Sequence, residues 1–152
     1  MKKLNLGCGV DTRKGFVNLD IIKHPGVDVV HDLNNLPLPF ESNSFDYILC
    51  NAILEHLPNM IYVMEELWRI SKPNAIIEID VPHFSGELAY RDPTHVKFFH
   101  SKTFDAWDIN NKSRNKTTLG LKMMFDVNSR ISFFGKNNMP VTKPINKIKL
   151  FY

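Results

Sequence analysis

Short apolar segments alternate with polar segments along the first half of the chain, and they predict five β-strands. Each apolar segment ends at or just before a Gly, Asp, Asn or Pro, and the five are Lys3–Leu6, Phe16–Asp20, Val27–His31, Tyr47–Cys50 and Ala75–Val81. Near-continuous runs of Val, Ile and Leu are typical of strands covered on both faces, as in a parallel sheet. The pattern therefore predicts an α/β fold with a mostly parallel central sheet.

One helix is predicted between the fourth and fifth of these strands. Apolar residues recur there at helical spacing, namely Met60, Val63, Met64, Leu67 and Trp68. Such a stripe is typical of a helix that packs one side against a core. Pro58 can open this helix and Lys72–Pro73 can end it. Glu65 and Arg69 are expected to form an ion pair on its exposed side.

The second half of the chain breaks this alternation. Residues 83–112 are rich in His, Asp and aromatic side chains, and they predict a loop with a short helix after Ser101. Phe125–Phe134 and Ile145–Tyr152 predict two further strands, paired and antiparallel, at the edge of the sheet. No linker separates two domains, so residues 1–152 are expected to form one domain with two parts, 1–82 and 83–152.

Composition is that of a globular protein, with 43% hydrophobic and 23% charged residues. Cys8 and Cys50 lie inside apolar runs, which favours free buried thiols in a reducing compartment. No apolar window reaches the length of a membrane span, about 18 residues, and the N-terminus lacks the apolar region of a signal peptide. The sequence therefore predicts a cytoplasmic protein.

Charge is distributed unevenly behind the net value of +3. Residues 1–111 hold ten Lys and Arg against fifteen Asp and Glu, whereas residues 112–152 hold nine Lys and Arg against one Asp. A basic end of this kind can meet nucleic acid, a phosphorylated substrate or a membrane surface, or it can simply keep the surface solvated.

Unusual polar or glycine residues follow four of the predicted strands. Gly7-Cys8-Gly9, Asp20, Asp32 and Asn51 each come directly after a β run. Ligands of open α/β sheets sit outside the carboxyl ends of the strands, so these groups are expected along one rim. Each residue alone also suits a turn or a cap. Together they predict a site for a cofactor that contains a nucleoside.

The chemistry of a nucleoside suits these residue types. Glycines let the backbone turn sharply and approach a ligand closely. The carboxylate of Asp20 is placed to accept hydrogen bonds from a ribose diol, and that of Asp32 from an adenine amino group, with Leu33 packed on the ring. Asn51 and its neighbours are expected to close over the rest of the ligand.

A dinucleotide is not favoured by the glycine pattern. The dinucleotide fingerprint needs a third glycine, where this chain has Thr12. Asp20 follows Gly9 by only eleven positions, which leaves no room for the full helix whose N-terminus would bind a pyrophosphate. S-adenosylmethionine has no phosphate and does not need that helix.

The same residues resemble the class I S-adenosylmethionine-dependent methyltransferases, in particular the type 11 group. The resemblance covers residues 4 to about 82, and it rests on the segments Leu4–Gly9, Asn18–Asp20, His31–Leu33, Ser44–Ile48, Asn51–Leu57, Leu67–Ile70 and Lys72–Ala75. It implies a Rossmann-like three-layer sandwich that binds S-adenosyl-L-methionine. The cofactor-binding residues that it implies are Leu6, Gly7, Cys8, Gly9, Asp20, Ile21, Asp32, Leu33, Asn51, Ala52 and His56.

The chain also departs from the family pattern. Asn5 stands where the first motif commonly has an acidic residue, and Asp11 stands where a glycine is usual. The helix after the first strand is nearly absent, and the helices that usually precede that strand are missing. The fold is therefore expected to be reduced at its N-terminus. The acceptor site is expected to be open, or covered by residues 83–112 or by a second subunit of a homo-oligomer.

Candidate catalytic residues lie beyond the fourth and fifth strands. Methyl transfer from a sulfonium needs chiefly alignment, and a base helps when the acceptor is a hydroxyl. His56, His83, Asp92 and His95 are the candidates, and we select His95 as the base with Asp92 as the group that orients it. The alternative is a structural turn at Asp92–Pro93, with His95 packed beneath it.

The cluster of histidines in residues 83–100 does not predict a metal site. His83, Asp92, His95 and His100 lack the close spacing of helical metal ligands, so no metal is expected. The aromatic residues of the same region are expected to form either an apolar wall for the acceptor or a small satellite core. They are Phe84, Tyr90, Phe98, Phe99 and Trp107.

Three functions are compatible with the sequence. The first is methyl transfer to a small molecule or a glycan. The second is methylation of nucleic acid held by the basic C-terminal region, although the sequence has no base-flipping motif or RNA-binding module. The third is a non-catalytic domain that binds S-adenosylmethionine for regulation.

Overall fold

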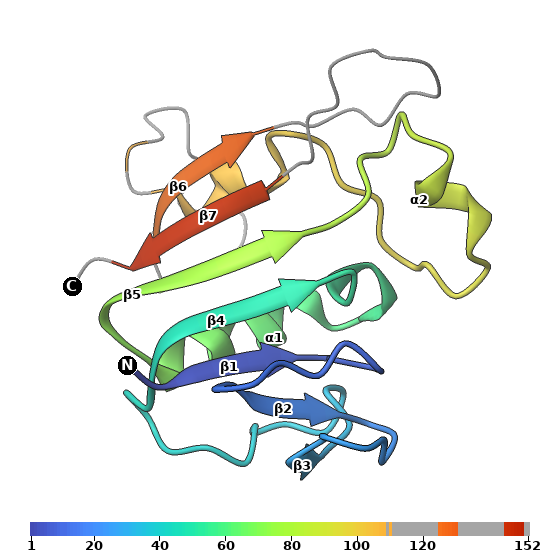
Figure 1. The fold of residues 1–152 in the computed structure, drawn as a ribbon. Coiled ribbons are helices and arrows are strands. Elements are labelled where there is room, and N and C mark those ends of the chain that lie inside the picture. The colour runs from blue at the N-terminus through green and yellow to red at the C-terminus, as the bar shows by residue number, and fades with distance from the viewer. Residues whose placement is uncertain (109, 111–124, 131–144, 151–152) are drawn as a thin grey trace.

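A single sheet organises the part of the chain that the computed structural model describes, which is residues 1–108, 110, 125–130 and 145–150. Its strand order is β3-β2-β1-β4-β5-β7-β6 (Figure 1). The strands are β1 (Lys3–Leu6), β2 (Val17–Asp20), β3 (Val29–Val30), β4 (Phe45–Asn51), β5 (Ser71–Asp80), β6 (Phe125–Arg130) and β7 (Ile145–Leu150). The helical elements are η1 (Leu54–His56), α1 (Met60–Ile70), α2 (Leu88–Arg91) and η2 (Thr103–Trp107).

The direction of the strands confirms the predicted fold class. Strands β1 to β5 pair in parallel, whereas β7 runs antiparallel to both β5 and β6. The two C-terminal strands therefore pair as predicted, with β6 at the edge of the sheet. Their predicted extensions beyond Arg130 and Leu150 lie outside the described residues.

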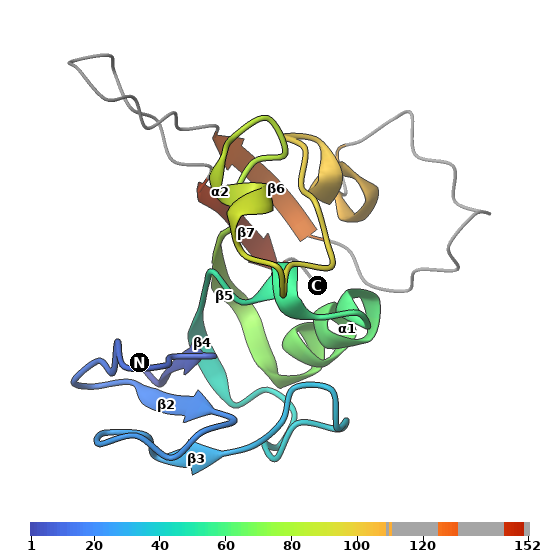
Figure 2. The same ribbon diagram turned by 90° about the vertical axis from the view of Figure 1, so that its right-hand side faces the viewer.

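Helix α1 covers one face of the sheet (Figure 2). Its predicted apolar stripe is largely buried: Met60, Val63, Met64 and Leu67 join the core, and Trp68 packs against that core. The facing side chains come from β1, β4 and β5, and Leu4, Ile48 and Ile77 are among them. Within the described residues, no helix is long and apolar enough to cross a membrane.

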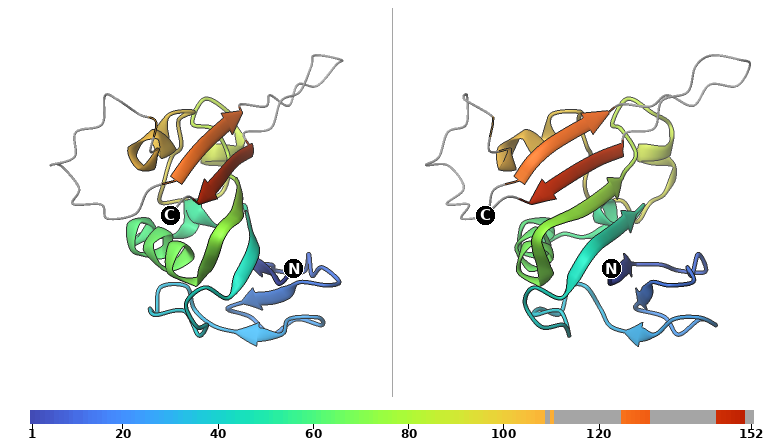
Figure 3. Two further views of the ribbon diagram at one scale, coloured as in Figure 1. Left: turned by 90° about the vertical axis from the view of Figure 1, so that its left-hand side faces the viewer. Right: turned by 60° about the vertical axis from the view of Figure 1, so that its left-hand side comes forward.

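The opposite face of the sheet carries mostly polar side chains on these strands, whereas a helix packed there would need apolar ones. Register places Asn18, Asn5, Leu49 and Glu78 side by side on neighbouring strands, so they share this face. Among the described residues no helix lies here, and the connection between β1 and β2 crosses it instead (Figure 3). The predicted loss of the helix after the first strand is therefore confirmed, and among the described residues no helix forms the third layer of the expected sandwich on this face.

The side chain of Asn5 holds the connection between β1 and β2 in place by hydrogen bonds. This side chain is buried, and its Nδ2 donates to the backbone oxygen of Asp11 at 2.8 Å and to Asn18 Oδ1 at 3.1 Å. Asn18 Oδ1 also accepts from the backbone N–H of Arg13 at 2.8 Å. An amide can both donate and accept in this way, whereas a carboxylate could only accept. The departure from the family motif at Asn5 thus has a structural reason.

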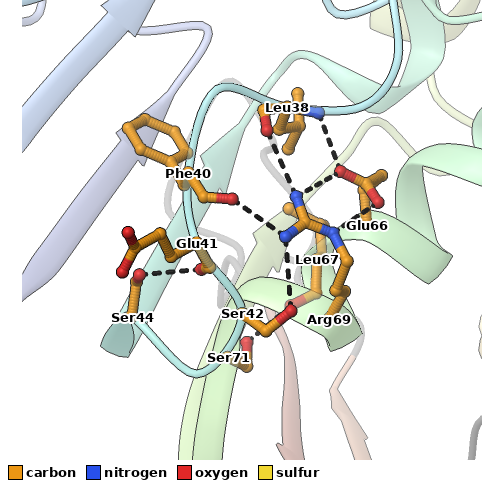
Figure 4. Close-up of polar contacts among 9 residues, drawn as sticks. All are labelled: Leu38, Phe40, Glu41, Ser42, Ser44, Glu66, Leu67, Arg69 and Ser71. Atoms are coloured by element: carbon orange, nitrogen blue, oxygen red, sulfur yellow. Dashed lines mark hydrogen bonds and ion pairs between the residues drawn. The ribbon is translucent and has the colours of Figure 1, made fainter.

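Arg69 fastens the connection between β3 and β4 to helix α1 (Figure 4). The predicted pair with Glu65 is wrong, because Arg69 Nε binds Glu66 Oε1 at 2.7 Å instead. The guanidinium also donates to the backbone oxygens of Leu38 and Phe40, at 3.1 and 2.8 Å. Glu66 Oε2 completes the contact by accepting from the N–H of Leu38 at 2.7 Å.

Candidate functional site

Strands β1, β2 and β4 end together at one rim of the sheet, at the right of Figure 1. Strand β1 lies between β2 and β4, so the chain order reverses at β1. Such a reversal is where open α/β sheets bind ligands. Gly7–Gly9 follows β1, Asp20 ends β2, and Asn51 ends β4. The structure therefore brings together the glycines, Asp20 and Asn51, as the sequence predicted.

Asp20 holds the ends of β1 and β2 together. Its Oδ2 accepts from the backbone N–H of Gly9 at 2.7 Å, and its Oδ1 accepts from the N–H of Ile22 at 2.9 Å. The N–H of Cys8 donates to the oxygen of Leu19 at 3.0 Å and continues the strand pairing past Leu6. The carboxylate is thus fixed in orientation, and each of its oxygens keeps the capacity for a second hydrogen bond.

Two glycines shape the loop after β1, and each has a different role. Gly7 adopts a φ of +63°, and a Cβ built on it would lie 2.4 Å from Cγ1 of Ile53. This glycine therefore lets the loop after β1 pack against the exit from β4. Gly9 adopts a φ of +51°, and a Cβ there would meet nothing within 4 Å. The backbone at Gly9 consequently borders open space next to the Asp20 carboxylate.

The apolar groups at the rim differ from those expected. Leu33 is only 5% exposed and belongs to the core, so its side chain does not form the expected ring-packing surface. Leu6 is also fully buried and reaches the rim only through its backbone. Ile21, directly after Asp20, is 58% exposed. Ile21 is therefore an exposed apolar side chain at the rim beside the carboxylate, as Ile22 is, at 57% exposed.

Asp32 caps a local turn, which is the structural role that the sequence left open beside ligand binding. Its Oδ1 accepts from the backbone N–H of Asn34 at 2.9 Å and from the Asn34 side chain at 3.1 Å. This is the Asx turn by which Asp commonly starts a loop. Oδ2 of Asp32 has no protein partner within the described part of the chain, so one oxygen remains for a ligand.

The exit from β4 presents backbone and small side chains. Asn51 and Ala52 are both exposed. Ala52 has a φ of +50°, and its N–H donates to the oxygen of Asp80 at 2.8 Å. This left-handed turn directs the chain away from the sheet into η1, which carries Glu55 and His56.

A second segment is fastened over η1. The backbone oxygen of Glu55 accepts from the N–H groups of Val96 and Lys97, at 2.8 and 3.1 Å. These bonds hold the segment that follows α2 beside the exit from β4. Figures 1 and 2 show α2 beyond the carboxyl ends of β4 and β5. His95 and Asp92 are therefore on the same side of the sheet as the rim.

His95 is directed toward Glu55, and not toward Asp92. Its Nε2 lies 4.0 Å from Glu55 Oε1, and the two side chains are 8% and 1% exposed. Its Nδ1 lies 3.0 Å from the backbone oxygen of Ala89. Among the described residues, no side-chain hydrogen bond joins Asp92 to His95. The expected Asp92–His95 pair is thus replaced by a Glu55–His95 pair.

Asp92 is connected to the other histidine of this region. Its Oδ1 accepts from the hydroxyl of Thr94 at 2.6 Å, and Thr94 Oγ1 lies 2.9 Å from His56 Nδ1. The hydrogen bonds from Thr94 lower the pKa of the Asp92 carboxyl. The rings of His56 and His95 meet edge to face, with centroids 4.7 Å apart. Glu55, His56 and His95 therefore form one cluster.

Glu55 is the functional candidate that sequence reasoning missed. Burial raises the pKa of its carboxyl, and Oε2 has no hydrogen-bond partner among the described residues. A signal was present, because Glu55 interrupts the apolar run Ile53–Leu57. Charged residues are rarely buried without a partner or a role.

The remaining histidines of residues 83–100 form a separate pair. The rings of His83 and His100 have centroids 5.7 Å apart, and His83 Nδ1 lies 2.7 Å from Ser85 Oγ. Burial, and then His100, lowers the pKa of His83. The four residues whose spacing was examined for a metal site, His83, Asp92, His95 and His100, therefore do not gather at one place. His83 and His100 lie together, whereas His95 faces Glu55.

The aromatic residues of this region are divided between the core and the surface. Phe99 and Trp107 are buried in the core. Tyr90 and Phe98 are exposed and stack on each other with centroids 5.0 Å apart, and Phe84 is also exposed. Tyr90 and Phe98, which flank His95 in the sequence, therefore form an exposed apolar surface in the segment that lies beyond the carboxyl ends of the strands.

Comparison with known proteins adds a family and a fold. The model of the methyltransferase domain family matches residues 4–79. Demethylmenaquinone methyltransferase of Listeria welshimeri is 32% identical over 83 residues, which cover 48% of this chain and 35% of that protein. The corresponding protein of Oceanobacillus iheyensis is 40% identical over 75 residues, which cover 47% and 30%. The chain thus spans about a third of the length of these relatives.

Structural similarity extends over nearly the whole chain. A crystal structure of a SAM-dependent methyltransferase from Archaeoglobus fulgidus superposes with a TM-score of 0.64 at 16% identity, covering 97% of this chain and 85% of that one. At this identity the likeness concerns the fold, which is the Rossmann-like sheet expected from the sequence.

Proposed function

Because the chain belongs to the methyltransferase domain family of S-adenosylmethionine-dependent enzymes, we propose that it transfers the methyl group of this cofactor to a small-molecule acceptor. The observation that carries the proposal is the Asp20 carboxylate. Its two oxygens are oriented by the N–H groups of Gly9 and Ile22, beside open space at Gly9. A fixed carboxylate with spare acceptor capacity suits the two hydroxyls of a ribose.

The rim residues fit the cofactor in charge and shape. Asp20 would hold the ribose, and the exposed side chain of Ile21 would cover one face of the adenine. The free Oδ2 of Asp32 would accept from the adenine amino group. Cys8, Gly9, Asn51 and Ala52 would contribute backbone beside the amino-acid part. The rim needs no phosphate-binding helix, in keeping with a cofactor that has no phosphate.

Bound S-adenosylmethionine supplies a methyl group on a sulfonium, which is an activated leaving group. The protein therefore has to align donor and acceptor and to keep competing water away. Fixed elements suit such alignment, and the backbone of Glu55 ties the segment after α2 to η1 through two hydrogen bonds. The Nε2 lone pair of His95, directed into this region, can take a proton or hold a cation.

The acceptor is proposed to be a small molecule with an apolar part. Two observations support this choice. Tyr90 and Phe98 form an exposed stacked pair on the acceptor side. The curated relatives are named for demethylmenaquinone, although they match mainly the cofactor half of this chain. We assign residues 1–82 to cofactor binding and 83–152 to the acceptor side.

Calorimetric titration of S-adenosylmethionine and, separately, of NAD into the purified protein tests the cofactor. We expect micromolar binding of the first and none of the second. The same protein, incubated with a set of phenols, quinols and monosaccharides, should release S-adenosylhomocysteine with an apolar hydroxyl compound. Absence of cofactor binding would overturn the proposal, and binding without turnover of any acceptor would favour the non-catalytic alternative.

Nucleic-acid methylation remains the second candidate for the acceptor. It depends on the basic residues of 112–152, most of which lie outside the described part of the structure. Binding of a generic oligonucleotide at several salt concentrations separates it from the first. A steep loss of affinity with salt would favour nucleic acid, because it reports neutralised phosphates.

A further inference from the structure

Three side chains with metal-binding atoms converge on the acceptor side. Glu55 and His56 belong to η1, and His95 belongs to the segment after α2. One ligand atom from each lies within 4.8 Å of the others. His95 is distant in sequence from the other two. Hydrogen bonds from Val96 and Lys97 to the backbone oxygen of Glu55, and the contact between Thr94 and His56, hold its segment beside η1.

Both imidazole rings are held in the tautomer that a metal ligand needs. The backbone oxygen of Ala89 can only accept, so His95 Nδ1 carries the proton and its Nε2 keeps a lone pair. Thr94 donates its hydroxyl proton to Asp92, so its oxygen accepts from His56 Nδ1, and His56 Nε2 likewise keeps a lone pair. Metal-binding histidines characteristically donate their second N–H to a carbonyl or a carboxylate network in this way.

The carboxylate of Glu55 lacks what a buried anion requires. Its side chain is 1% exposed, its Oε2 has no partner among the described residues, and its Oε1 lies 4.0 Å from His95 Nε2. Burying a carboxylate without a hydrogen bond or a counter-ion is costly. A divalent cation between Glu55 and the two histidines would supply the missing charge.

We propose that Glu55, His56 and His95 form a binding site for a divalent transition-metal ion, with zinc as the ion that suits them. Two imidazoles and one carboxylate are a known ligand set for zinc sites that keep an open coordination position. Zinc bonds of about 2.0–2.2 Å bring ligand atoms to roughly 3.3 Å from one another. His95 Nε2 and Glu55 Oε1 would therefore approach by less than an ångström from their 4.0 Å separation. Ligand atoms as far apart as the 4.8 Å limit of the cluster would approach by roughly 1.5 Å.

Binding of the ion can be argued from the three side chains alone. Its role in the reaction rests on the proposed function, methyl transfer to a small molecule. An ion at the acceptor side would bind the hydroxyl oxygen of the acceptor and lower its pKa. The hydroxyl proton would leave to solvent, and the oxygen would form its bond to the methyl carbon as the bond from sulfur to that carbon breaks. Methyl transfer does not in general need a metal, so this would be a specific property of the acceptor.

Zinc binding is tested without the cofactor. Chelator-treated, desalted protein is titrated with zinc chloride in competition with a chromophoric indicator. We expect one equivalent to bind, and Glu55→Gln, His56→Ala and His95→Ala each to weaken binding at least tenfold. His100→Ala, an exposed histidine outside the cluster, should bind zinc as the wild type does. Absence of binding, or unchanged binding in the Glu55→Gln and His95→Ala variants, would overturn the proposal.

Cobalt provides a readout that needs no variant. Cobalt(II) bound to the wild-type protein should give visible bands of a nitrogen and oxygen site, whereas an intense thiolate band would place the ion on a cysteine and overturn the proposal. A parallel titration with S-adenosylmethionine separates the two hypotheses. Cofactor binding without zinc binding would remove the metal site alone, and zinc binding without cofactor binding would remove the proposed function alone.

Discussion

The Oδ2 atom of Asp20 accepts a 2.7 Å hydrogen bond from the backbone N–H of Gly9, and this contact ties the end of β2 to the loop after β1. The bond holds the Asp20 carboxylate beside the open space that borders the backbone of Gly9. The carboxylate is oriented before any ligand arrives, so a ligand that uses it does not bear the entropic cost of ordering it.

Replacement of Asp20 by alanine should weaken binding of S-adenosylmethionine by about 1–3 kcal/mol, because the ribose hydroxyls would lose their acceptor. Calorimetry measures the change, and circular dichroism checks that the variant folds. Glu41→Ala removes an exposed carboxylate at the opposite end of the sheet and should leave the affinity unchanged. Equal affinity in Asp20→Ala and wild type would contradict the ribose assignment.

Replacement of Gly7 by alanine should lower the free energy of unfolding by about 2 kcal/mol or more. The added Cβ meets the side chain of Ile53, and the left-handed backbone itself costs an alanine roughly 1–2 kcal/mol. Urea unfolding measures the loss. Gly15→Ala is the matched control, because Gly15 also has a positive φ but open space around it. Equal losses in both variants would show that Ile53 contributes nothing.

Replacement of Arg69 by alanine should cost about 1.5–3 kcal/mol of unfolding free energy, because a half-buried guanidinium bonded to Glu66 and two backbone oxygens is removed. Thermal or urea unfolding provides the comparison. Glu65→Ala should stay within about 0.5 kcal/mol of the wild type, as expected for an exposed side chain. A large effect of Glu65→Ala would restore the pair predicted from the sequence.

The Glu66–Arg69 contact should also give a pH dependence. Hydrogen bonding to Arg69 lowers the pKa of the Glu66 carboxyl in the folded protein. A lowered folded pKa stabilises the fold above the unfolded pKa of about 4.3, and this contribution is lost as the pH falls through the folded value. The stability difference between wild type and Glu66→Gln should therefore shrink between about pH 5 and pH 3. A difference that stays constant over this range would contradict the assignment.

Replacement of His95 by alanine should reduce turnover at least tenfold and change the affinity for S-adenosylmethionine less than twofold. The reason is that His95 lies with Glu55 on the acceptor side, whereas the cofactor residues lie at the ends of β1 and β2. Initial rates and calorimetry on the same preparation separate the two effects. His100→Ala serves as the control, and an unaltered rate in His95→Ala would exclude His95 from the reaction.

Periodic patterns predicted the elements that depend on local sequence. The apolar stripe from Met60 to Trp68 identified helix α1, since one side of a helix must be apolar to pack on a sheet. The residues at the strand ends predicted the rim, because parallel strands bring their carboxyl ends to one edge. By contrast, the four-residue helix α2 lacks a stripe long enough to detect, and it was not predicted.

Pairings between side chains were the less predictable part. Glu65 and Glu66 both lie within reach of Arg69 along the helix, and the backbone of Leu38 and Phe40 decides between them. Asp92 is the carboxylate nearest to His95 in sequence, yet its oxygen is used by Thr94, and the fold brings Glu55 to His95 instead. Short sequence separation did not predict contact in either case.

The sequence by itself determined the class of fold, the position of the rim and the family, because strand periodicity and strand-ending residues are local properties of the chain. Only the tertiary structure decided that Asn5 braces a helix-free connection, that Leu33 is buried while Ile21 is exposed, and that Glu55, His56 and His95 meet. These contacts depend on strand register and on backbone hydrogen bonds between distant segments, and no local pattern of residues encodes them.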